Sequence, residues 1–320
     1  MKLIIELSGG LGNQIFQYLA GQYLASSITP PPSVQYTLSS YLTLGYRSLN
    51  VDKLFPDIKV TELNTPNSSF LSSAIHLCSK AFVYSNMGSK LFQNISLISP
   101  VLHLSEPSFA NIAEAGNHSP LVRLKSSLLY RPYRRNRTFV ISGFWQDVSP
   151  YLPSLDLLAS SLIDTQTLLP NELKGRKYVA LHLRKGDYYD AKETRHLYQR
   201  MHSPICFALT ACRSLPSQYR SLPLVIVTDD KPHASLLLPL LAEMHPSVII
   251  YSSPNPLIDW SVLHNASFRI LANSTFSVTS ALLSIHPRQH ELCNFLPQWF
   301  NSGIHSADVS WDLIPLTLLL

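Results

Sequence analysis

The sequence predicts an α/β protein with two Rossmann-type domains, and three observations lead to this prediction. The 320 residues are enough for two domains of ordinary size, each with its own core. The chain opens with an apolar strand, a glycine-rich turn and an apolar-periodic helix, which is the first unit of a Rossmann-like domain. The C-terminal half alternates strands and helices, a pattern typical of a parallel sheet with right-handed crossovers. We expect the two domains to span residues 1–165 and 166–320.

The N-terminal unit consists of a strand over residues 2–7, a turn over 8–14 and a helix from about Ile15 to Ser27. Glycines in the turn let backbone amides at the start of the helix face a ligand. A nicotinamide-dinucleotide fingerprint is not completed, because Ile15 stands at the third glycine position and no acid follows until Asp52. A Walker phosphate loop is excluded as well, since no Gly-Lys-Ser/Thr follows.

The rest of the N-terminal half contains a loop, two more strands and a connection. Residues 26–33 include three consecutive prolines and predict a loop, and residues 34–38 predict a second strand. Residues 139–142 predict another strand, which runs into Gly143-Phe-Trp-Gln146. The proline-dotted stretch 150–170 predicts the passage between the domains.

The C-terminal half predicts four strands separated by helices. The expected strands cover residues 178–183, 224–228, 248–251 and 269–272, and the expected helices lie near 204–214, near 232–244, from about 257, and up to about 284. We therefore expect a parallel sheet whose strand ends meet at one edge, where ligands of open α/β sheets bind.

The strand at 178–183 carries the most informative residues of the chain. Alternation along a strand places His182 and Arg184 on one face, just before Gly186. Arginine offers a planar fork of donors that fits a phosphate, and glycine lets the backbone come close, so this strand end predicts a pyrophosphate site. The alternative is an ordinary buried strand that ends in a charged turn.

A second group of polar residues follows the strand near 269–272. Ser274 and Thr275 stand where a strand hands over to a helix, so they can offer hydroxyls and amides to the same anion. The alternative is a simple helix cap.

Composition and charge narrow the class of protein. The formal net charge is +5, and six basic side chains without an acid gather between Arg123 and Arg137. This basic segment could face anionic lipid or an acidic substrate, or it could be a solvated loop. No nucleic-acid recognition motif accompanies it, so we expect no nucleic-acid partner.

The four cysteines and the lengths of the apolar stretches indicate the cellular compartment of the protein. The cysteines lie far apart without a C-x-x-C pair, and we expect them to be reduced, buried small hydrophobes. No stretch reaches the roughly 18 apolar residues of a membrane span, and we expect no signal peptide, because an acid and a glycine turn interrupt the apolar start. We expect a cytoplasmic protein, with the basic segment as the place for peripheral membrane contact.

Motifs spread along the chain resemble glycosyltransferase family 11, the α-1,2-fucosyltransferases, and more distantly the protein O-fucosyltransferases and α-1,6-fucosyltransferases. They are Gly9-Gly-Leu-Gly-Asn-Gln-Ile-Phe-Gln-Tyr18, Tyr46-Arg47 with Phe55, Ser142-Gly-Phe-Trp-Gln146, His182-Leu-Arg-Lys-Gly-Asp-Tyr188, Asp259 with Ile270-Leu-Ala-Asn-Ser-Thr-Phe-Ser277, and Pro297-Gln-Trp299. The resemblance implies a GT-B-like fold, with two Rossmann-type domains facing a central cleft. It implies an inverting transfer of L-fucose from GDP-fucose to a galactoside hydroxyl of a glycan or surface-polysaccharide intermediate.

The resemblance also implies roles for individual residues. Arg184 would grip the β-phosphate and stabilise the leaving group, and Asp259 would take the guanine ring nitrogens. The remaining donor-site residues would be His182, Asn273, Ser274, Thr275 and Phe276. Asn13 would point at the sugar and acceptor, with Gly10, Gly12 and Gln14 beside it on the acceptor side. The N-terminal domain would thus be the acceptor side and the C-terminal domain the GDP-fucose side.

Neither a metal nor another cofactor is expected. Asp229-Asp230 looks like a manganese-binding acidic pair, but the two acids are adjacent, lack a spacer and precede Lys231, which favours a structural cap or a non-metal role in the donor pocket. Asp187 is the nearest candidate for a catalytic base, and the alternative is a cap or a partner of the arginine.

The chain also departs from the family pattern. Val278-Thr279 stands where family members commonly carry two tryptophans, and Ser203–Arg213 replaces a tyrosine-rich helix. Two further functions therefore stay open: a transferase that uses another GDP-sugar or a protein hydroxyl acceptor, and a non-catalytic nucleotide-sugar-binding module.

Overall fold

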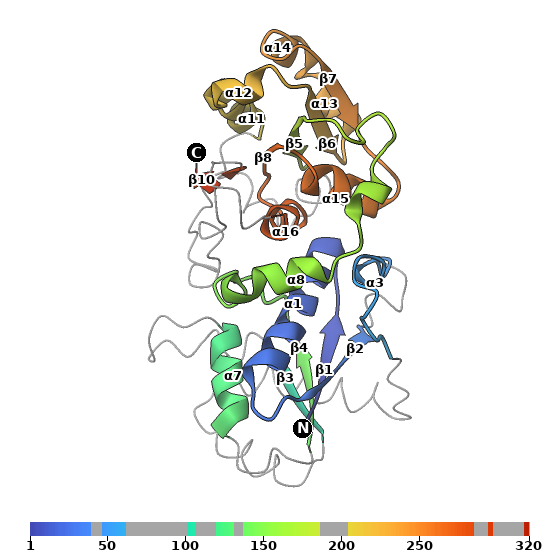
Figure 1. The fold of residues 1–320 in the computed structure, drawn as a ribbon, viewed down its shortest axis with the longest axis vertical. Helices are drawn as coiled ribbons and strands as arrows, with labels where there is room; N and C mark the ends of the chain where they lie inside the picture. The colour runs from blue at the N-terminus through green and yellow to red at the C-terminus, as the bar shows by residue number, and fades with distance from the viewer. Residues whose placement is uncertain are drawn as a thin grey trace. The chain divides into compact units, whose positions relative to one another are not determined.

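The computed structural model describes residues 1–39, 47–61, 101–105, 120–130, 137–185, 204–284, 294–296 and 317–319. They form two compact units (Figure 1). The first unit comprises Met1–Gly9, Gln17–Ser48 and Ile58–Trp145, and the second comprises Gly10–Phe16, Leu49–Asp57 and Gln146–Leu320. These units are not the two continuous ranges 1–165 and 166–320, and the acceptor and donor roles of those ranges stay predictions.

The first unit contains a four-stranded parallel sheet in the order β2-β1-β4-β3. Its strands are β1 (Lys2–Leu7), β2 (Ser33–Leu38), β3 (Val101–Ser105) and β4 (Thr138–Ser142). Leu3, Ile4 and Ile5 on consecutive positions of β1 are all buried, so both faces of this strand are covered, as is usual in parallel sheets. The described helix of this unit outside α1 is α7 (Pro120–Tyr130).

Helix α1 (Leu11–Ser27) starts four residues earlier than the sequence predicts. The backbone N–H of Gln14 donates to the carbonyl of Gly10 at 3.0 Å, so the glycine turn itself becomes the first turn of the helix. Residues up to Phe16 group with the second unit and residues from Gln17 with the first.

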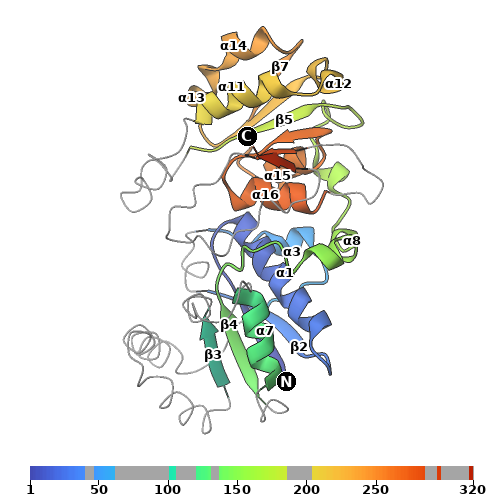
Figure 2. The ribbon, with the colours of Figure 1, turned by 90° about the vertical axis from the view of Figure 1, so that its left-hand side faces the viewer.

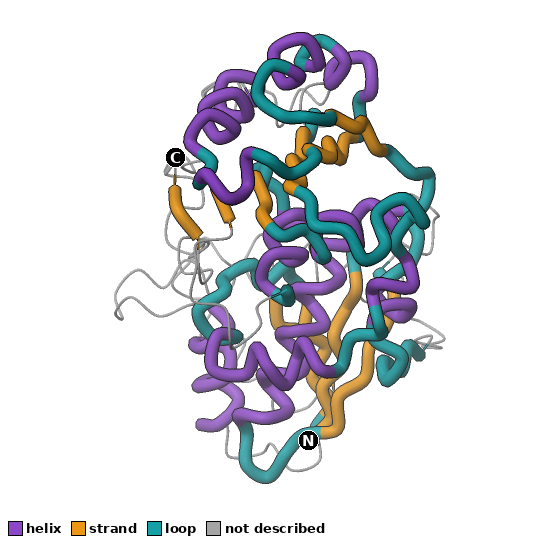
Figure 3. The backbone as a smooth tube through the Cα atoms, turned by 45° about the horizontal axis from the view of Figure 1, so that its top comes forward, coloured by secondary structure: helices purple, strands orange, loops and turns teal. Residues whose placement is uncertain are grey.

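The second unit contains a six-stranded sheet in the order β10-β9-β8-β5-β6-β7, in which every described pairing is parallel. Its strands are β5 (Val179–Leu183), β6 (Leu224–Thr228), β7 (Val248–Tyr251), β8 (Phe268–Ile270), β9 (Asn294–Leu296) and β10 (Thr317–Leu319). Strands and helices alternate along this unit, and Figure 3 distinguishes them by colour. The predicted α/β class, with a parallel sheet in each of two units, is confirmed. That the fold is GT-B-like stays a prediction.

Four short helices of the second unit, counted over the described residues, precede its first strand, β5, in the sequence. They are α3 (Val51–Leu54), the 3-10 helix η2 (Leu152–Ser154), α8 (Leu155–Ser160) and the 3-10 helix η3 (Thr165–Leu168). The stretch 150–170, predicted as the passage between domains, therefore folds as part of this unit.

Further helices follow the strands of the second sheet. They are α11 (Pro204–Ser214), α12 (Ser217–Arg220), α13 (Lys231–Ser235), α14 (Leu238–Ala242), α15 (Pro256–His264) and α16 (Thr275–Leu282). The single helix predicted near 232–244 is wrong, because the chain forms α13 and α14 in its place. Pro239 explains the break: proline is tolerated in the first turn of a helix, where it stands in α14, but not in the interior.

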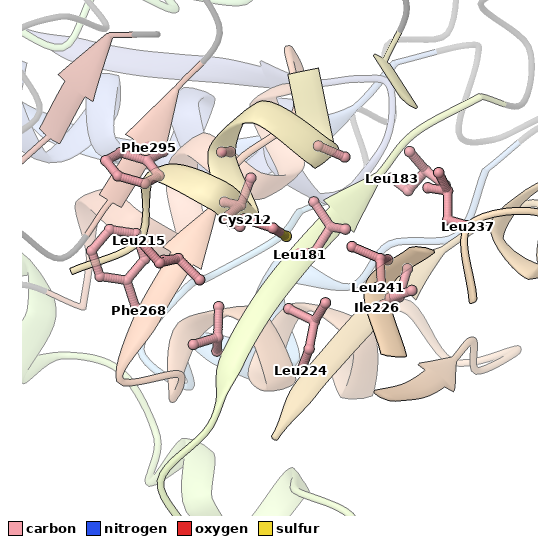
Figure 4. Close-up of a cluster of buried hydrophobic side chains, with 14 of the residues drawn as sticks. Leu181, Leu183, Cys212, Leu215, Leu224, Ile226, Leu237, Leu241, Phe268 and Phe295 are labelled. Atoms are coloured by element: carbon pink, nitrogen blue, oxygen red, sulfur yellow. The ribbon is translucent and has the colours of Figure 1, made fainter. Parts of the chain in front are cut away.

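Helices cover the two faces of the second sheet differently. Alternate residues of β5 and β6, among them Leu181 and Ile226, pack with α11, α13 and α14 in one buried cluster (Figure 4). The intervening residues, such as Ala180 and Val225, pack with α15 in another cluster. Figures 1 and 2 both show α11, α13 and α14 on one side of β5 and α15 and α16 on the other. The period-two alternation therefore sends His182 to the side of α15 and α16.

The described cysteines fit the expectation only in part. Cys212 is buried in the cluster of Figure 4, as expected, but Cys206 is exposed, so the expectation of burial is wrong there. The reason is helical geometry, because positions six residues apart on α11 face different directions. Cys78 and Cys293 lie outside the described residues.

Among the described helices, none is long and apolar enough to cross a membrane. In the basic segment, Lys125 lies over the ring of Tyr23, with Nζ 5.5 Å from the ring centre. Residues 131–136 of this segment lie outside the described part of the chain, and membrane contact stays a prediction.

Candidate functional site

The site is built from the carboxyl end of β5, the central strand on which the sequence prediction depends. His182 is the fourth residue of β5, and Arg184 follows the strand. The parallel neighbours β6 and β8 end beside it, so the residues after Thr228 and Ile270 come to the same edge of the sheet. Every site residue described below belongs to the second unit.

His182 is buried, with 6% of its surface exposed, and its ring lies against Phe276 of α16 with ring centres 5.6 Å apart. Burial, and secondarily the charge of Arg184, lowers the pKa of His182 to about 3, so the imidazole is neutral at physiological pH. Within the described part of the chain, its buried Nδ1 has no hydrogen-bond partner. Because buried polar atoms are normally paired, this nitrogen is suited to meeting a polar atom of a ligand.

Arg184 forms an ion pair with Asp229, the residue that follows β6. Nη1 of Arg184 lies 2.5 Å from Oδ2 of Asp229, and both side chains are about one-quarter exposed, at 25% and 27%. A guanidinium carries five donors in a plane, so it can bind more than one acceptor at the same time. The predicted phosphate-binding arginine thus stands at the predicted edge of the sheet with a fixed counter-ion.

The N-terminus of α16 supplies the second part of the site. Ser274 is the N-cap of α16, and its hydroxyl accepts the N–H of Phe276 at 3.4 Å. The hydroxyl of Thr275 donates to Oδ1 of Asn13 at 2.9 Å. Both hydroxyls are therefore engaged within the protein, and α16 offers an anion chiefly the N–H groups of its first turn and its dipole. Asn273 precedes this cap and is buried.

The glycine turn of α1 packs directly on the start of α16. A Cβ added to Gly12 would lie 2.4 Å from the backbone N of Phe276 and from the backbone C of Thr275, so only glycine fits here. Oδ1 of Asn13 accepts from Thr275 and also from Nε2 of Gln146 at 3.3 Å. With its oxygen directed at these two donors, the amide nitrogen of Asn13 is turned away from them. The structure therefore brings Gly12 and Asn13 together with the predicted donor-site residues.

Gly10 and Gln14 belong to the same turn as Gly12 and Asn13, but Gly10 borders open space and Gln14 contacts the start of α3. A Cβ added to Gly10 would meet nothing within 4 Å. Gln14 is fully buried, and its Oε1 accepts the backbone N–H groups of Asn50 at 3.0 Å and Val51 at 3.3 Å, at the start of α3. Gln14 thus anchors a neighbouring helix, and the acceptor-side role of both residues stays a prediction.

Asp259 lies in the first turn of α15, close enough to Asp229 and Lys231 to feel their charges. Burial raises the pKa of Asp259 to about 7. Its Oδ1 accepts the backbone N–H of Ser253 at 2.9 Å. A carboxylate has about four lone-pair sites, so this bond leaves acceptor capacity for the two N–H donors of a guanine edge.

Asp187, the candidate base, lies outside the described residues. Asp230, which the sequence assigned to a cap or a non-metal role, is the N-cap of α13, where its Oδ1 accepts the N–H of His233 at 2.9 Å. Sequence reasoning missed the pairing of Asp229 with Arg184 and that of Gln146 with Asn13. Strand order could have indicated the first, because both residues follow the ends of adjacent parallel strands.

Taken together, the arrangement joins a guanidinium, a helix N-terminus and a neutral buried imidazole at one strand edge, with a carboxylate at the start of α15. The first two stabilise negative charge on an oxyanion or phosphate, because they are preorganised donors in a partly desolvated place. A carboxylate with spare acceptor capacity can accept hydrogen bonds from N–H donors, such as those of a nucleobase. This chemistry suits a nucleoside diphosphate.

Comparison with known proteins adds a distant relative. No protein-family model matches the chain. It is 24% identical over 302 residues to an α-1,2-colitosyltransferase from Escherichia coli, a match that covers 88% of this chain and 87% of that enzyme.

Solved structures give weaker similarities. The fucosyltransferase NodZ from Bradyrhizobium is 14% identical, with a TM-score of 0.45 over 88% of this chain and 92% of NodZ. The E. coli ADP-heptose lps heptosyltransferase II is 10% identical, with a TM-score of 0.46 over 100% and 90% of the two chains. Both TM-scores lie below 0.5. The chain is thus similar, over most of its length, to a bacterial glycosyltransferase.

Proposed function

We propose that this chain is an inverting GDP-sugar glycosyltransferase that transfers L-fucose from GDP-fucose to a galactoside hydroxyl in α-1,2 linkage. The observation that carries the proposal is the strand-edge cluster of His182, Arg184 and the N-terminus of α16, with Asp259 at the start of α15. The similarity to an α-1,2-colitosyltransferase over 88% of the chain supports the same class of reaction.

In the proposed reaction, the bond between the sugar C1 and the β-phosphate oxygen breaks while an acceptor hydroxyl bonds to C1 from the opposite face. Negative charge grows on the departing diphosphate, and Arg184 with the first-turn N–H groups of α16 stabilises it. Loss of one such preorganised donor typically costs about 100- to 1,000-fold in rate. His182, neutral and buried, would complete the diphosphate site through its ring nitrogen.

Two further roles complete the proposal. Asp259 selects the guanine base, because an ionised carboxylate accepts from two guanine donors at once. Asn13, whose side-chain oxygen is held by Thr275 and Gln146, presents its amide N–H groups to the sugar or the acceptor. The acceptor proton leaves to a base, for which Asp187 is our candidate. No metal takes part, because Arg184 and the helix supply the positive charge.

A second candidate donor is the colitosyl nucleotide, which the name of the E. coli relative favours. The test is a screen of GDP-fucose, GDP-colitose, GDP-mannose and ADP-sugars against galactosides, other glycans and a peptide hydroxyl. GDP release that depends on an acceptor, with product linkage read by NMR, identifies both partners. We expect GDP-fucose with a terminal galactoside to give an α-1,2 product. Binding of GDP-sugars without any turnover would favour a non-catalytic binding module and contradict the proposal.

A further inference from the structure

Two acidic residues at the end of β6 face two basic residues at the end of β5. The parallel pairing of these strands ends at Leu183 and Thr228, so the next residue on each strand is Arg184 and Asp229. The ion pairs follow this register. Arg184 lies 2.5 Å from Asp229, and Nζ of Lys185 lies 2.9 Å from Oδ2 of Asp230.

Asp229 is held by a second contact, which fixes the direction of its carboxylate. Its Oδ1 accepts the backbone N–H of Lys185 at 2.9 Å, while its Oδ2 contacts Arg184. The carboxylate is therefore tied to the main chain that carries the arginine as well as to the arginine itself. Two contacts on different oxygens restrict the rotation of the carboxylate, so it can orient the guanidinium plane.

Asp230 performs a different task, although it is adjacent in sequence. Its Oδ1 accepts the N–H of His233 and caps α13, and its Oδ2 pairs with the half-exposed Lys185. It is thus a helix cap whose ion pair, with side chains 36% and 26% exposed, is partly open to solvent, and solvent-accessible pairs contribute little to stability. The two neighbouring acids provide a matched test and control.

Any anion that binds Arg184 does so while Asp229 is paired with the same guanidinium. A diphosphate on the other edge of the guanidinium would bring like charge close to the Asp229 carboxylate, and like charges in a partly buried place oppose each other. The same carboxylate that orients Arg184 therefore weakens the hold of the site on an anionic product.

We propose that Asp229 is the positioning residue of the phosphate site: it orients Arg184 for the developing charge of the leaving group and, by its own charge, favours release of the nucleotide product. The inference rests on the proposed function and deepens it. It assigns to the first residue of the acidic pair a role in turnover that acts through Arg184 and not through a metal ion.

The test compares Asp229→Asn with Asp230→Asn in acceptor-dependent turnover and in calorimetric binding of GDP. For Asp229→Asn we expect kcat to fall by about tenfold or more while the Kd for GDP becomes about threefold tighter, because orientation and repulsion are lost together. Asp229→Ser, a smaller neutral side chain, should show the same split. Asp230→Asn should lower the melting temperature through the lost cap but leave kcat within about threefold.

A double-mutant cycle then separates action through Arg184 from a general effect. In an Arg184→Lys background, Asp229→Asn should lower kcat by less than it does in the wild type, because the fork that it orients is gone. A wild-type kcat in Asp229→Asn, or parallel losses of kcat, GDP affinity and melting temperature, would overturn the inference. Failure of the wild type to bind any GDP-sugar would instead overturn the proposed function.

Discussion

The hydroxyl of Thr275 donates a hydrogen bond of 2.9 Å to the side-chain oxygen of Asn13, across 262 residues of sequence. The neighbouring backbone is packed tightly as well, because a Cβ added to Gly12 would lie 2.4 Å from the backbone N of Phe276 and the backbone C of Thr275. The first turn of α1 and the first turn of α16 therefore interlock within the second unit. A substitution in the glycine turn should therefore alter the start of α16, where we propose that the phosphate binds.

Gly12→Ala should destabilise the protein and impair nucleotide binding. A Cβ 2.4 Å from backbone atoms must displace backbone, and overpacking of this kind costs about 1–3 kcal/mol. This overpacking cost outweighs the stabilisation of about 0.5–1 kcal/mol that alanine gives over glycine inside a helix. Urea denaturation and calorimetry with GDP measure both effects.

Gly10→Ala is the matched control for this change. A Cβ at Gly10 meets nothing within 4 Å, so stability should stay within about 0.5 kcal/mol of the wild type. If Gly12→Ala behaved like Gly10→Ala, the close approach of the two helices would be contradicted.

The Asn13–Thr275 bond should appear as coupling in a double-mutant cycle. Asn13→Ala and Thr275→Val each remove one partner of the bond, and the double variant should be less destabilised than the sum of the two by about 1 kcal/mol. Chemical denaturation of the four proteins gives the coupling energy. Additive effects would show that the two side chains do not interact in solution.

Arg184→Ala should reduce transfer by about 100-fold or more while the fold stays intact, and Arg184→Lys should restore little of it. Lysine can keep the charge opposite Asp229, but a point charge cannot present a bidentate fork to a phosphate. Initial rates together with melting temperatures separate activity from folding. Near-normal rates in the lysine variant would refute the phosphate role of Arg184.

Asp259 should make GDP binding depend on pH. Burial raises its pKa to about 7, so the ionised form that accepts guanine donors fills in as the pH rises from about 6 to about 8, and GDP affinity should rise by about five- to tenfold. Asp259→Ala should bind GDP at least about tenfold more weakly, with no dependence of this kind. Calorimetry over this pH range measures both.

ADP serves as the control ligand, because its diphosphate titrates in the same way while its base lacks the guanine donors. The stability of the folded protein should also depend on pH, but it should fall with rising pH, whereas GDP affinity rises. The folded state keeps a proton on Asp259 that the unfolded chain, with the ordinary pKa of 3.8, releases, so stability falls as the pH rises from 3.8 to about 7 and levels off above that. A variant Asp259→Ala that bound GDP normally and still rejected ADP would place base recognition elsewhere.

Excess EDTA should leave transfer within about twofold of the untreated rate, since the leaving-group charge is met by Arg184 and backbone amides. Asp229 and Asp230 both already pair with cationic side chains, which disfavours their use as metal ligands. Rates before and after chelation, with manganese or magnesium added back, decide the matter. Complete loss that manganese restores would return the acidic pair to a metal role.

Local sequence signals predicted strands better than helix boundaries. Residues 2–7, 224–228 and 248–251 are strands as expected, because apolar runs between turn residues have few alternatives in a parallel sheet. Helix α1 begins early and the helix near 232–244 is split, since these features depend on the glycine turn and on Pro239.

Which residues would share a site could be predicted as far as alternation along a strand and the common edge of parallel strands decide it. His182 and Arg184 follow from alternation along one strand, and the start of α16 follows from the next strand along the sheet. The burial that keeps His182 neutral and raises the pKa of Asp259 could not be predicted, because it depends on helices packed over them.

The sequence by itself determined that the chain is α/β and that an arginine and a helix start meet at a strand edge, because both follow from short-range periodicity. Only the tertiary structure decided that Asp229 holds Arg184 and that Asn13 is held by Thr275 and Gln146. These contacts join residues 45 or more positions apart. Their geometry depends on strand order and on the close approach that Gly12 allows, neither of which is written in any local pattern.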